Sequence, residues 1–512
     1  MSIDPSTPIL IGAGQSVDRI DSSCYRGWAA PDLAADAARS AFHDAGIGSD
    51  AAQHIGAIAT SRTFEDSRPQ PAVFGKSDNF PRSVARRLGI DPRLAVWEPG
   101  GGNSPQDLVN EFAGRIAVGE FDAVLIAGAE AISTVRHAQR TGIQLDFSES
   151  PGGSVEDRGP GIDAFYDPLA RRHGINTPTL SYALAENARR ARCGRTRADY
   201  AAEMGALFAP FAAVAHRNPY AAWDAPAFSA DELIAIDAHN RWIADPYPLR
   251  LVARDQVNLG AALLLCSVGF ADRFGIATDR RVFLHGHAKA VEKSLLSRPD
   301  LGDSPAAKAA LSTALDRAGI AASDVAAFDF YSCYPIAVSN AAIDGVGLDP
   351  ADPRCLTLTG GLPFFGGPGN NYSMHGIAEA VARARRGDGD RVLVGANGGY
   401  LSKYSVGVYS TEPRSWTPSS DRTLQAALDA VPSATILPTF SGDARIESYT
   451  VHHDRSGPAY ASIAARTATG ERIAARSAEG DGDTALSAHE DDALDRAVTV
   501  WDSDGVNLFR FA

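Results

Sequence analysis

Residues 360–375, GGLPFFGGPGNNYSMH in one-letter code, combine residue types that can bind and polarise a small ligand. Several glycines precede Asn370, Asn371, Tyr372 and His375, and the stretch leads directly into a helix-like run, GIAEAVARARRG. Glycines let backbone N–H groups approach a ligand closely, and a helix N-terminus presents unpaired donors with a partial positive charge. The stretch therefore predicts a site for an anion, a phosphate or a developing oxyanion, with His375 at its mouth. A glycine-rich turn with a buried structural histidine is the alternative.

The composition is that of an ordinary globular protein, with 45% hydrophobic and 21% charged residues among 512, enough for two or three domains. A net charge of −14 argues against a nucleic-acid partner. No apolar run approaches the roughly 18 residues that a membrane helix needs, and the first residues lack a secretory-signal pattern. A cytoplasmic protein is therefore expected. The five cysteines have no CxxC spacing, which predicts reduced thiols and no metal site.

Strand-like and helix-like segments alternate through the first 135 residues. PILIGAGQ predicts a buried strand, PDLAADAARSAFHDAG a helix that stops at glycine, and IGAIATSR, LAVWEP and FDAVLIAGAEA further strands. A second glycine-rich turn, which begins at Gly100, leads into the helix between the last two strands. The alternation predicts an α/β fold in which helices cover both faces of a sheet.

The second half of the chain repeats this order. The helix ends DAGI and RAGI place Gly46 opposite Gly319, and the strands DAVLIAG and DRVLVGA place Asp122 opposite Asp390 at nearly the same offset. LTLTGG is expected as a strand that leads into residues 360–375. An internal duplication follows, in which the turn at Gly100 is the counterpart of the loop at residues 366–371. Two such turns, each at a helix N-terminus, are expected to face one crevice.

Two regions break the repeat. Residues 136–254 are expected to form short helices that lie over the pocket as a lid or substrate-shaping layer. Within them the arginine-rich run ARRARCGRTR is either a solvated face or a grip on phosphates. After a linker and one short helix, TLQAALDAVPSA, the last 90 or so residues alternate apolar and polar positions. They predict a small antiparallel β domain, OB-like, that docks or caps, with His452 and His453 on its surface rather than on a metal.

Together these features resemble the thiolase superfamily. The matching blocks are NRWIADPYPLRLVARDQVNLGAALLLCS, DFYSCYPIAV, LTLTGGLPFFGGPGNNYSMHGIAEAV and GANGGYLSKYSVGVYS. Within the superfamily the chain is similar to thiolase-like proteins of the sterol-carrier-protein-2 branch, grouped with acetyl-CoA acetyltransferases, that carry an added C-terminal β domain. The resemblance implies a duplicated, five-layered αβαβα fold. It divides the chain into an N-terminal half (1–280, including a helical loop domain at 136–254), a C-terminal half (281–412) and an additional β domain (420–512).

The resemblance also implies a nucleophilic cysteine at the start of the helix after the third strand, and here the chain departs from the family. Aligning Gln106 with the glutamine usual in that helix puts Gly101 at the cysteine position. A covalent acyl-enzyme cannot form on glycine. Ser104, the nearest hydroxyl, precedes Pro105 and is expected as a helix N-cap rather than a nucleophile.

Other positions of the family's site have changed as well. The catalytic histidine falls on Asn370, and the second catalytic cysteine falls near Ala396 or Asn397. In the loop FDFYSCYPIAV, Tyr334 stands where relatives carry asparagine, while Asp329 remains. Ordinary thiolysis or Claisen condensation through an acyl-enzyme is therefore not expected.

What remains is a predicted thioester pocket. The candidates for holding the thioester carbonyl are Gly101, Asn103, Ser104, Asn370, Asn371, Asn397 and Gly398. The candidates for proton transfer are His375, Tyr372, Tyr334, Tyr331 and Cys333. The expected ligand is coenzyme A or an acyl-CoA, which suggests a place in fatty acid and lipid metabolism, with no tightly bound cofactor.

Three functions stay open at this point. The first is an acyltransferase-family protein that binds CoA or an acyl-CoA thioester without ordinary thiolase activity. The second is a C–C lyase, a retro-aldolase on a β-hydroxyacyl-CoA, because the resemblance implies that some thiolase-like proteins without the cysteine act as aldolases with a β-domain partner. The third is a non-catalytic acyl-CoA or lipid-binding protein. Homodimer and monomer both remain open, as does a protein partner for the C-terminal β domain.

Overall fold

The computed structural model describes residues 3–161, 167–387 and 389–512. Its core is a ten-stranded sheet in the order β10-β11-β12-β9-β1-β8-β4-β2-β3-β5. The two halves of the sheet meet where β1 pairs antiparallel with β9, through Ile9 opposite Phe283 and Leu10 opposite Val282. The strands of the first half are β1 (Pro8–Val17), β2 (Ala57–Thr60), β3 (Leu94–Trp97), β4 (Ala123–Ala131), β5 (Glu156–Asp157) and β8 (Asn258–Ser267). Those of the second are β9 (Val282–Val291), β10 (Val325–Phe330), β11 (Arg391–Gly398) and β12 (Lys403–Ser410).

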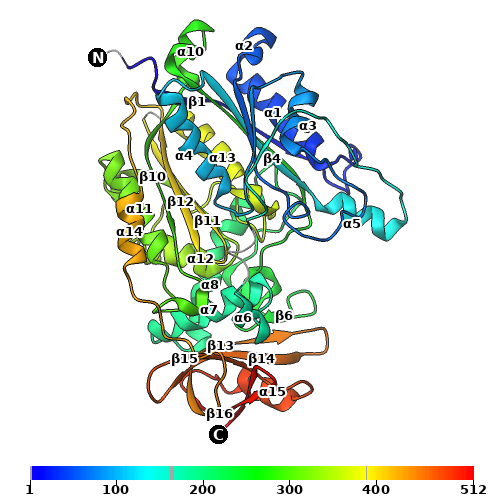
Figure 1. Cartoon of the computed structure of the whole chain (residues 1–512), viewed down its shortest axis with the longest axis vertical. Helices are drawn as coiled ribbons and strands as arrows, with labels where there is room; N and C mark the ends of the chain where they lie inside the picture. The colour runs from blue at the N-terminus through cyan, green and yellow to red at the C-terminus, as the bar shows by residue number, and fades with distance from the viewer. Residues whose placement is uncertain (1–2, 162–166, 388) are drawn as a thin grey trace.

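Helices complete a layered arrangement around this sheet. In Figure 1, α4 (Ser104–Ala117) and α13 (Tyr372–Arg386) lie between the two halves of the sheet, α1 (Ala30–Ala45) and α3 (Phe80–Leu88) cover one outer face, and α11 (Pro305–Ala318) covers the other. The predicted duplicated αβαβα fold is confirmed. Both α1 and α11 end at a glycine in the left-handed region, Gly46 and Gly319, with φ of 69° and 68°.

One predicted strand does not form as expected. LTLTGG, residues 356–361, has no assigned strand, although Phe328 N donates to Cys355 O at 2.9 Å and Phe330 N donates to Leu356 O at 3.1 Å. These two hydrogen bonds keep the segment beside β10. Its backbone then turns away because Thr359 N donates to the Asp329 carboxylate at 3.0 Å rather than to a neighbouring strand.

The segment between the halves forms a layer of helices below the sheet (Figure 1). It contains α6 (Pro168–Arg172), α7 (Pro178–Arg192), α8 (Arg197–Ala215) and α9 (Ala230–Ile234), whereas α5 (Ile132–Thr141) lies beside the first half of the sheet (Figure 1). Part of the predicted helical run GPGIDAFYDPLARRHG, residues 162–166, lies outside the described residues. Phe208 and Phe211 of α8 are fully buried, and the Phe208 ring contacts Phe364 of the glycine-rich stretch at 6.2 Å between centroids. The layer therefore packs directly on that stretch.

The arginine-rich run divides into two buried arginines, Arg189 and Arg190, and exposed ones such as Arg192 and Arg195. Arg189 pairs with Asp344 at 2.8 Å, Arg190 pairs with Asp492 at 2.7 Å, and Arg189 and Arg190 are only 5% and 2% exposed. Because the guanidinium groups already bind carboxylates, they tie the helical layer to the second half of the sheet and to the C-terminal domain.

The C-terminal domain is a closed barrel of five strands in the order β14-β15-β17-β16-β13, with β13 pairing back to β14. Its elements are β13 (Gly442–His453), β14 (Pro458–Thr467), β15 (Arg472–Arg476), α15 (Gly482–Glu490), β16 (Ala497–Ser503) and β17 (Val506–Phe511). The predicted OB-like domain is confirmed. Two short strands of the helical layer, β6 (Trp242–Ala244) and β7 (Tyr247–Pro248), extend the barrel sheet through Ala244 opposite His452.

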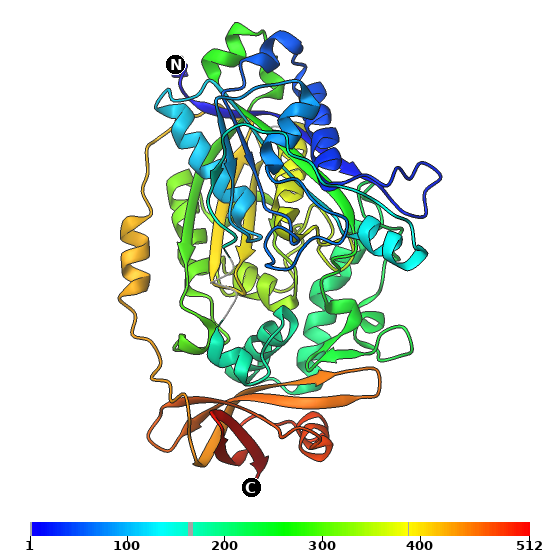
Figure 2. The ribbon, with the colours of Figure 1, turned by 45° about the vertical axis from the view of Figure 1, so that its right-hand side comes forward.

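A linker joins the barrel to the sheet. Figure 2 shows it running down one side of the molecule, with α14 (Arg422–Asp429) halfway along. Gln425 holds this helix against β9, because its side chain accepts from Val291 N at 2.8 Å and donates to Val291 O at 3.0 Å. The linker is therefore docked along the core.

None of the described helices is long and apolar enough to cross a membrane. Within the same described ranges, no three or more histidine, cysteine, aspartate or glutamate side chains gather in a way that would hold a metal ion.

Candidate functional site

The two glycine-rich turns pack against each other at the N-termini of α4 and α13. Ser373, in the first turn of α13, donates from Oγ to Gly102 O at 2.7 Å. Asn370 Nδ2 donates to Arg62 O at 2.7 Å and to Ser67 Oγ at 3.3 Å, beside the backbone of Gly100. The two glycine-rich turns, which the internal duplication predicts as counterparts, therefore contact each other.

The glycines of this site are fixed by close packing. A Cβ on Gly102 would lie 2.5 Å from the Tyr331 ring and from Asn397 O. A Cβ on Gly398 would overlap Asn103 Oδ1. A Cβ on Gly101, the residue predicted at the nucleophile position, would lie 2.5 Å from Asn103 Oδ1. Because Asn103 is 4% exposed and lies between Gly101 and Gly398, it occupies the space that a side chain at residue 101 would need.

The side-chain amides that were expected to donate to a thioester carbonyl already donate to protein acceptors. Asn103 Nδ2 binds Asp107 at 2.9 Å, Asn371 Nδ2 binds Gly128 O at 2.8 Å, and Asn397 Nδ2 binds Tyr182 OH at 2.7 Å. The oxygens Asn103 Oδ1 and Asn397 Oδ1 are buried and have no partner among the described residues. These two amides therefore present acceptors, not donors, to the interior of the site.

Backbone donors remain at the turn itself. The N–H groups of Gly101, Gly102 and Asn103 have no acceptor in the described part of the chain. They precede α4, where a helix N-terminus leaves such groups unpaired and adds a partial positive charge. Ser104 does not supply a nucleophile, because its Oγ donates to Pro99 O at 2.8 Å.

A cluster of tyrosines closes the site on the side of the helical layer. The rings of Tyr182 and Tyr334 stack at 4.5 Å, and Tyr334 OH hydrogen-bonds Thr179 Oγ1 at 2.8 Å. Tyr372 OH binds Thr359 Oγ1 at 2.6 Å. Burial raises the pKa of Tyr334 and Tyr372, so their hydroxyls stay protonated at neutral pH. Tyrosines in this state can donate a proton but cannot act as bases.

Two further members of the cluster differ in what they can do. Burial raises the pKa of the Cys333 thiol to about 12, so this cysteine is not a thiolate nucleophile at neutral pH. Tyr331 is 9% exposed, its ring lies at 5.2 Å and nearly perpendicular to that of Tyr372, and its hydroxyl makes no hydrogen bond to a described residue. Among the tyrosines predicted for proton transfer, Tyr331 is therefore the one whose hydroxyl is available to a ligand bound at Gly102.

His375 does not lie at the mouth of the site, as its place in the motif suggested. It is fully buried, and Nδ1 hydrogen-bonds Gln15 Oε1 at 2.7 Å while the ring packs on Phe365. His375 follows Ser373 by two positions in α13, and each position rotates the side chain by about 100° around the helix axis. The His375 side chain therefore points about 200° away from that of Ser373, which faces Gly102. Burial lowers the pKa of His375 to about 3, so the ring is neutral at physiological pH.

This burial predicts a pH-dependent contribution to stability. The folded-state pKa lies below the ordinary value, so unfolding lets His375 take up a proton at any pH under about 6.5. The contribution is complete above that pH and is lost as the pH falls toward 3. In urea titrations at pH 4 to 7, wild type should lose up to about 1.4 kcal/mol more per pH unit below pH 6 than His375→Gln. Parallel curves for the two proteins would show that His375 does not titrate on unfolding.

Sequence reasoning missed four residues of the site. Tyr182 comes from α7 in the helical layer, and nothing in the local sequence linked it to Asn397. Ser67 and Arg62 lie in the loop after β2, where they contact Asn370. Ser373 was inside the motif, and its position at the start of α13, next to a glycine turn, could have indicated a contact to that turn.

Comparison with known proteins agrees with this geometry. A family model described as the thiolase-like protein type 1 additional C-terminal domain matches residues 423–505. The crystal structure of a monomeric SCP2-thiolase like protein type 1 from Mycobacterium smegmatis is 43% identical, with a TM-score of 0.85, and the match covers 100% of both chains. No curated protein matches the sequence.

More distant structures share the fold alone. The Ltp2-ChsH2(DUF35) aldolase has a TM-score of 0.58 at 20% identity, over 81% of this chain and 100% of that one. An acetyl-CoA acetyltransferase from Syntrophomonas wolfei has a TM-score of 0.54 at 15% identity, over 80% of this chain and 100% of that one. With the M. smegmatis match covering the whole length at 43% identity, the chain belongs to the family of SCP2-thiolase-like proteins of type 1.

Proposed function

We propose that this protein binds coenzyme A or an acyl-CoA thioester at the paired glycine turns and does not form a covalent acyl-enzyme. The turn at residues 100–103 carries the proposal. Glycine stands where the family nucleophile would be, while the N–H groups of Gly101, Gly102 and Asn103 stay unpaired at the N-terminus of α4. Such donors suit a thioester carbonyl, whose oxygen gains negative charge when it is polarised. The named acetyl-CoA acetyltransferase among the structures of this fold supports a CoA ligand.

A C–C lyase acting on a β-hydroxyacyl-CoA is the second candidate, and Tyr331 favours it. Retro-aldol cleavage removes the β-hydroxyl proton, breaks the Cα–Cβ bond and returns a proton to the enolate of the thioester, with no covalent nucleophile. Burial raises the pKa of Tyr331, so its hydroxyl is protonated and would supply the enolate proton, while the β-hydroxyl proton passes to water. The Tyr331 hydroxyl has no hydrogen-bond partner among the residues that the structure describes, and its ring lies next to Gly102. One structure of the same fold is named an aldolase.

Two assays on one preparation separate these functions. If the lyase is correct, the protein cleaves a β-hydroxyacyl-CoA and Tyr331→Phe slows cleavage by about 100-fold or more. Tyr334→Phe is the matched control, because that hydroxyl already binds Thr179 and should affect the rate little. Thioester binding without cleavage would leave a non-catalytic acyl-CoA or lipid-binding protein, and absence of any CoA binding would contradict the shared premise.

We also infer that the protein acts as a monomer. The outer edge of β3 is covered by its own chain, since Val96 and Trp97 pair in parallel with Glu156 and Asp157 of β5. Arg158 N donates to Trp97 O at 3.1 Å and extends the cover by one residue. The edge of the sheet is then β5, which is only two residues long and offers a second copy a much shorter row of free N–H and C=O groups. The relative from M. smegmatis is also described as monomeric.

We propose that the face of the barrel toward the helical layer packs against this chain and does not recruit a partner protein. Ser462 Oγ donates to His173 O at 2.8 Å, and Asn187 Nδ2 of α7 donates to Tyr449 O at 3.0 Å. That face is therefore occupied by the helical layer that covers the site.

A further inference from the structure

A pocket of about 430 Å³ lies in the first half of the fold, and its volume is within the range of small-ligand sites. Its walls come mainly from the loop at residues 63–77, the start of α1, the end of β4 and the first turns of α5. Glu130 joins it to the site described above, because a Cβ on Gly369 would lie 2.1 Å from Glu130 Oε1. The pocket therefore adjoins the glycine turn at residues 366–371, although other residues line it.

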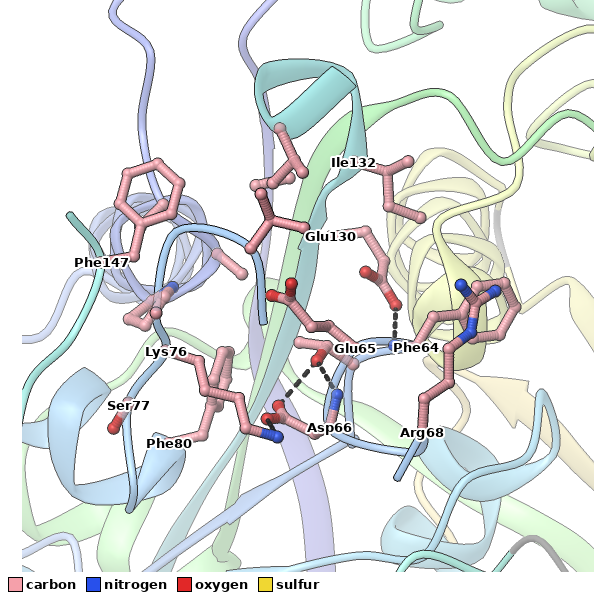
Figure 3. A pocket seen from close by; sticks show the side chains of 18 of the residues that line it. Phe64, Glu65, Asp66, Arg68, Lys76, Ser77, Phe80, Glu130, Ile132 and Phe147 are labelled. Atoms are coloured by element: carbon pink, nitrogen blue, oxygen red, sulfur yellow. Dashed lines mark hydrogen bonds and ion pairs between the residues drawn. The ribbon is translucent and has the colours of Figure 1, made fainter. Parts of the chain in front are cut away.

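Much of the wall is apolar. Its larger apolar side chains include those of Phe64, Phe80, Phe147 and Ile132 (Figure 3). Val73 lines the same pocket and is 59% exposed, which leaves a large apolar side chain open to solvent. Apolar walls of this kind bind the hydrocarbon part of a ligand, while a few polar groups fix its orientation.

Two ion pairs neutralise most of the charged side chains in the wall. Lys76 Nζ pairs with Asp66 Oδ1 at 3.0 Å. Arg136 Nη2 pairs with Asp255 Oδ2 at 3.0 Å. These four side chains therefore add no net charge to the pocket.

Arg68 and Glu65 are the remaining charged residues of the wall besides Glu130. Burial and the neighbouring Asp66 raise the pKa of the Glu65 carboxyl, whereas Lys76 and Arg68 lower it. Three cations thus lie beside three carboxyls, with Glu130 as the fourth. The wall therefore offers little excess charge of either sign to a ligand.

Glu130 is the buried polar group of the wall. It is 3% exposed, and Oε1 accepts from Phe64 N at 2.6 Å (Figure 3). Its second oxygen, Oε2, has no hydrogen-bond partner within the described part of the chain. Burial raises the pKa of Glu130 well above its ordinary value, and the neighbouring Asp66 and Glu65 act in the same direction, so the carboxyl is protonated and uncharged at neutral pH. An unpaired polar group at a buried position costs free energy that a hydrogen bond from a ligand would recover.

We propose that this pocket binds an uncharged carboxamide with a hydrocarbon body, whose amide group hydrogen-bonds Glu130 while the body packs against the phenylalanine side chains. An uncharged carboxyl has one O–H donor, and an amide combines a carbonyl acceptor with N–H donors. The Glu130 O–H can therefore donate to the amide carbonyl, and the amide N–H groups can donate to the neighbouring Glu65 carboxyl. A carboxylate or an ammonium group would bring a charge into a wall whose own charges are already balanced. Carboxamide binding here does not require the proposed thioester function.

Three probes with a six-carbon chain test the proposal. Binding of hexanamide, hexanoate and n-hexylammonium to the full-length protein is followed by ligand-observed NMR titration at pH 7.5. Hexanamide is expected to bind at least about tenfold more tightly than either charged probe. In Glu130→Leu, which removes the donor, hexanamide affinity is expected to fall at least about tenfold. Glu130→Gln supplies an N–H donor and keeps an acceptor for Phe64 N, so it should stay within about threefold of wild type.

Because Glu130 is buried, circular dichroism first checks that its variants are folded. Val73→Glu places a charge on the exposed part of the apolar wall, and a several-fold loss of hexanamide affinity is expected even if Glu130→Leu does not fold. Val118→Glu is the matched control, since Val118 is 79% exposed, does not line the pocket and should leave binding unchanged.

Five results would overturn the proposal. Either charged probe could bind as tightly as hexanamide, or hexanamide could fail to bind. Folded Glu130→Leu could keep the wild-type affinity, or folded Glu130→Gln could lose hexanamide as fully as Glu130→Leu does. Finally, Val73→Glu could bind hexanamide as tightly as Val118→Glu does.

Discussion

Thiolysis of a 3-ketoacyl-CoA by this protein is expected to be at least about 10⁴-fold slower than by a thiolase with its nucleophilic cysteine, because loss of a covalent nucleophile has effects of that size. We align Gly101 with the nucleophile position, Ser104 donates to Pro99 O, and burial raises the pKa of Cys333 to about 12. The measurement is CoA-dependent loss of acetoacetyl-CoA, with a cysteine-bearing thiolase assayed in parallel.

Gly101→Cys is the informative variant for the same prediction. The new side chain would meet Asn103 Oδ1 at 2.5 Å, and Asn103 is held by Asp107 and by the lack of space beside Gly398. The variant is therefore expected to remain inactive, although it restores the residue type. Ordinary thiolysis by the wild-type protein would contradict the account. Activity gained by Gly101→Cys alone would show that Asn103 can give way.

Arg472→Ala is expected to lower the free energy of unfolding by about 3 kcal/mol, because it leaves buried backbone carbonyls without their donor. Arg472 is fully buried in β15 of the barrel and pairs with Glu447 at 2.6 Å. It also donates to Leu296 O at 2.6 Å and to Pro299 O at 3.1 Å, in the loop after β9. Its loss leaves Leu296 O and Arg298 O without this donor, and leaves the Glu447 carboxylate paired with Arg466 alone, where the barrel meets the second half of the sheet.

Arg445→Ala is the matched control for that measurement. Its guanidinium is 62% exposed and pairs with Asp495, which is 83% exposed, so the change should stay within about 0.5 kcal/mol of wild type. Urea unfolding followed by fluorescence compares the three proteins. Equal stabilities of Arg472→Ala and Arg445→Ala would mean that Arg472 does not join the barrel to the core.

Much of the fold was predictable because the same signals occur twice in the chain. The glycines after α1 and α11 act as left-handed C-caps in both halves, and the glycine turns at residues 100 and 366 both precede a helix of the central layer. The segment at 356–361 was harder to predict. Its composition favours a strand, but hydrogen bonds to Asp329, a residue distant in sequence, decide its conformation.

The site was predictable in outline only. The convergence of the two turns follows from the duplication, whereas the direction of each side chain depends on which face of α13 it occupies. Ser373 faces Gly102 and His375 faces Gln15, although both belong to one motif. Tyr182 could not be found from local sequence, because its contact with Asn397 joins residues 215 positions apart. The arginine run likewise found its partners at distant aspartates such as Asp492.

Calorimetric titration with acetoacetyl-CoA in the absence of free CoA, followed by the intact mass of the protein, tests the central claim most directly. We predict saturable binding and an unchanged protein mass, because the N–H groups at residues 101–103 can hold the thioester while no nucleophile is present to be acylated. Absence of binding, or a protein mass increased by one acyl group, would contradict the claim.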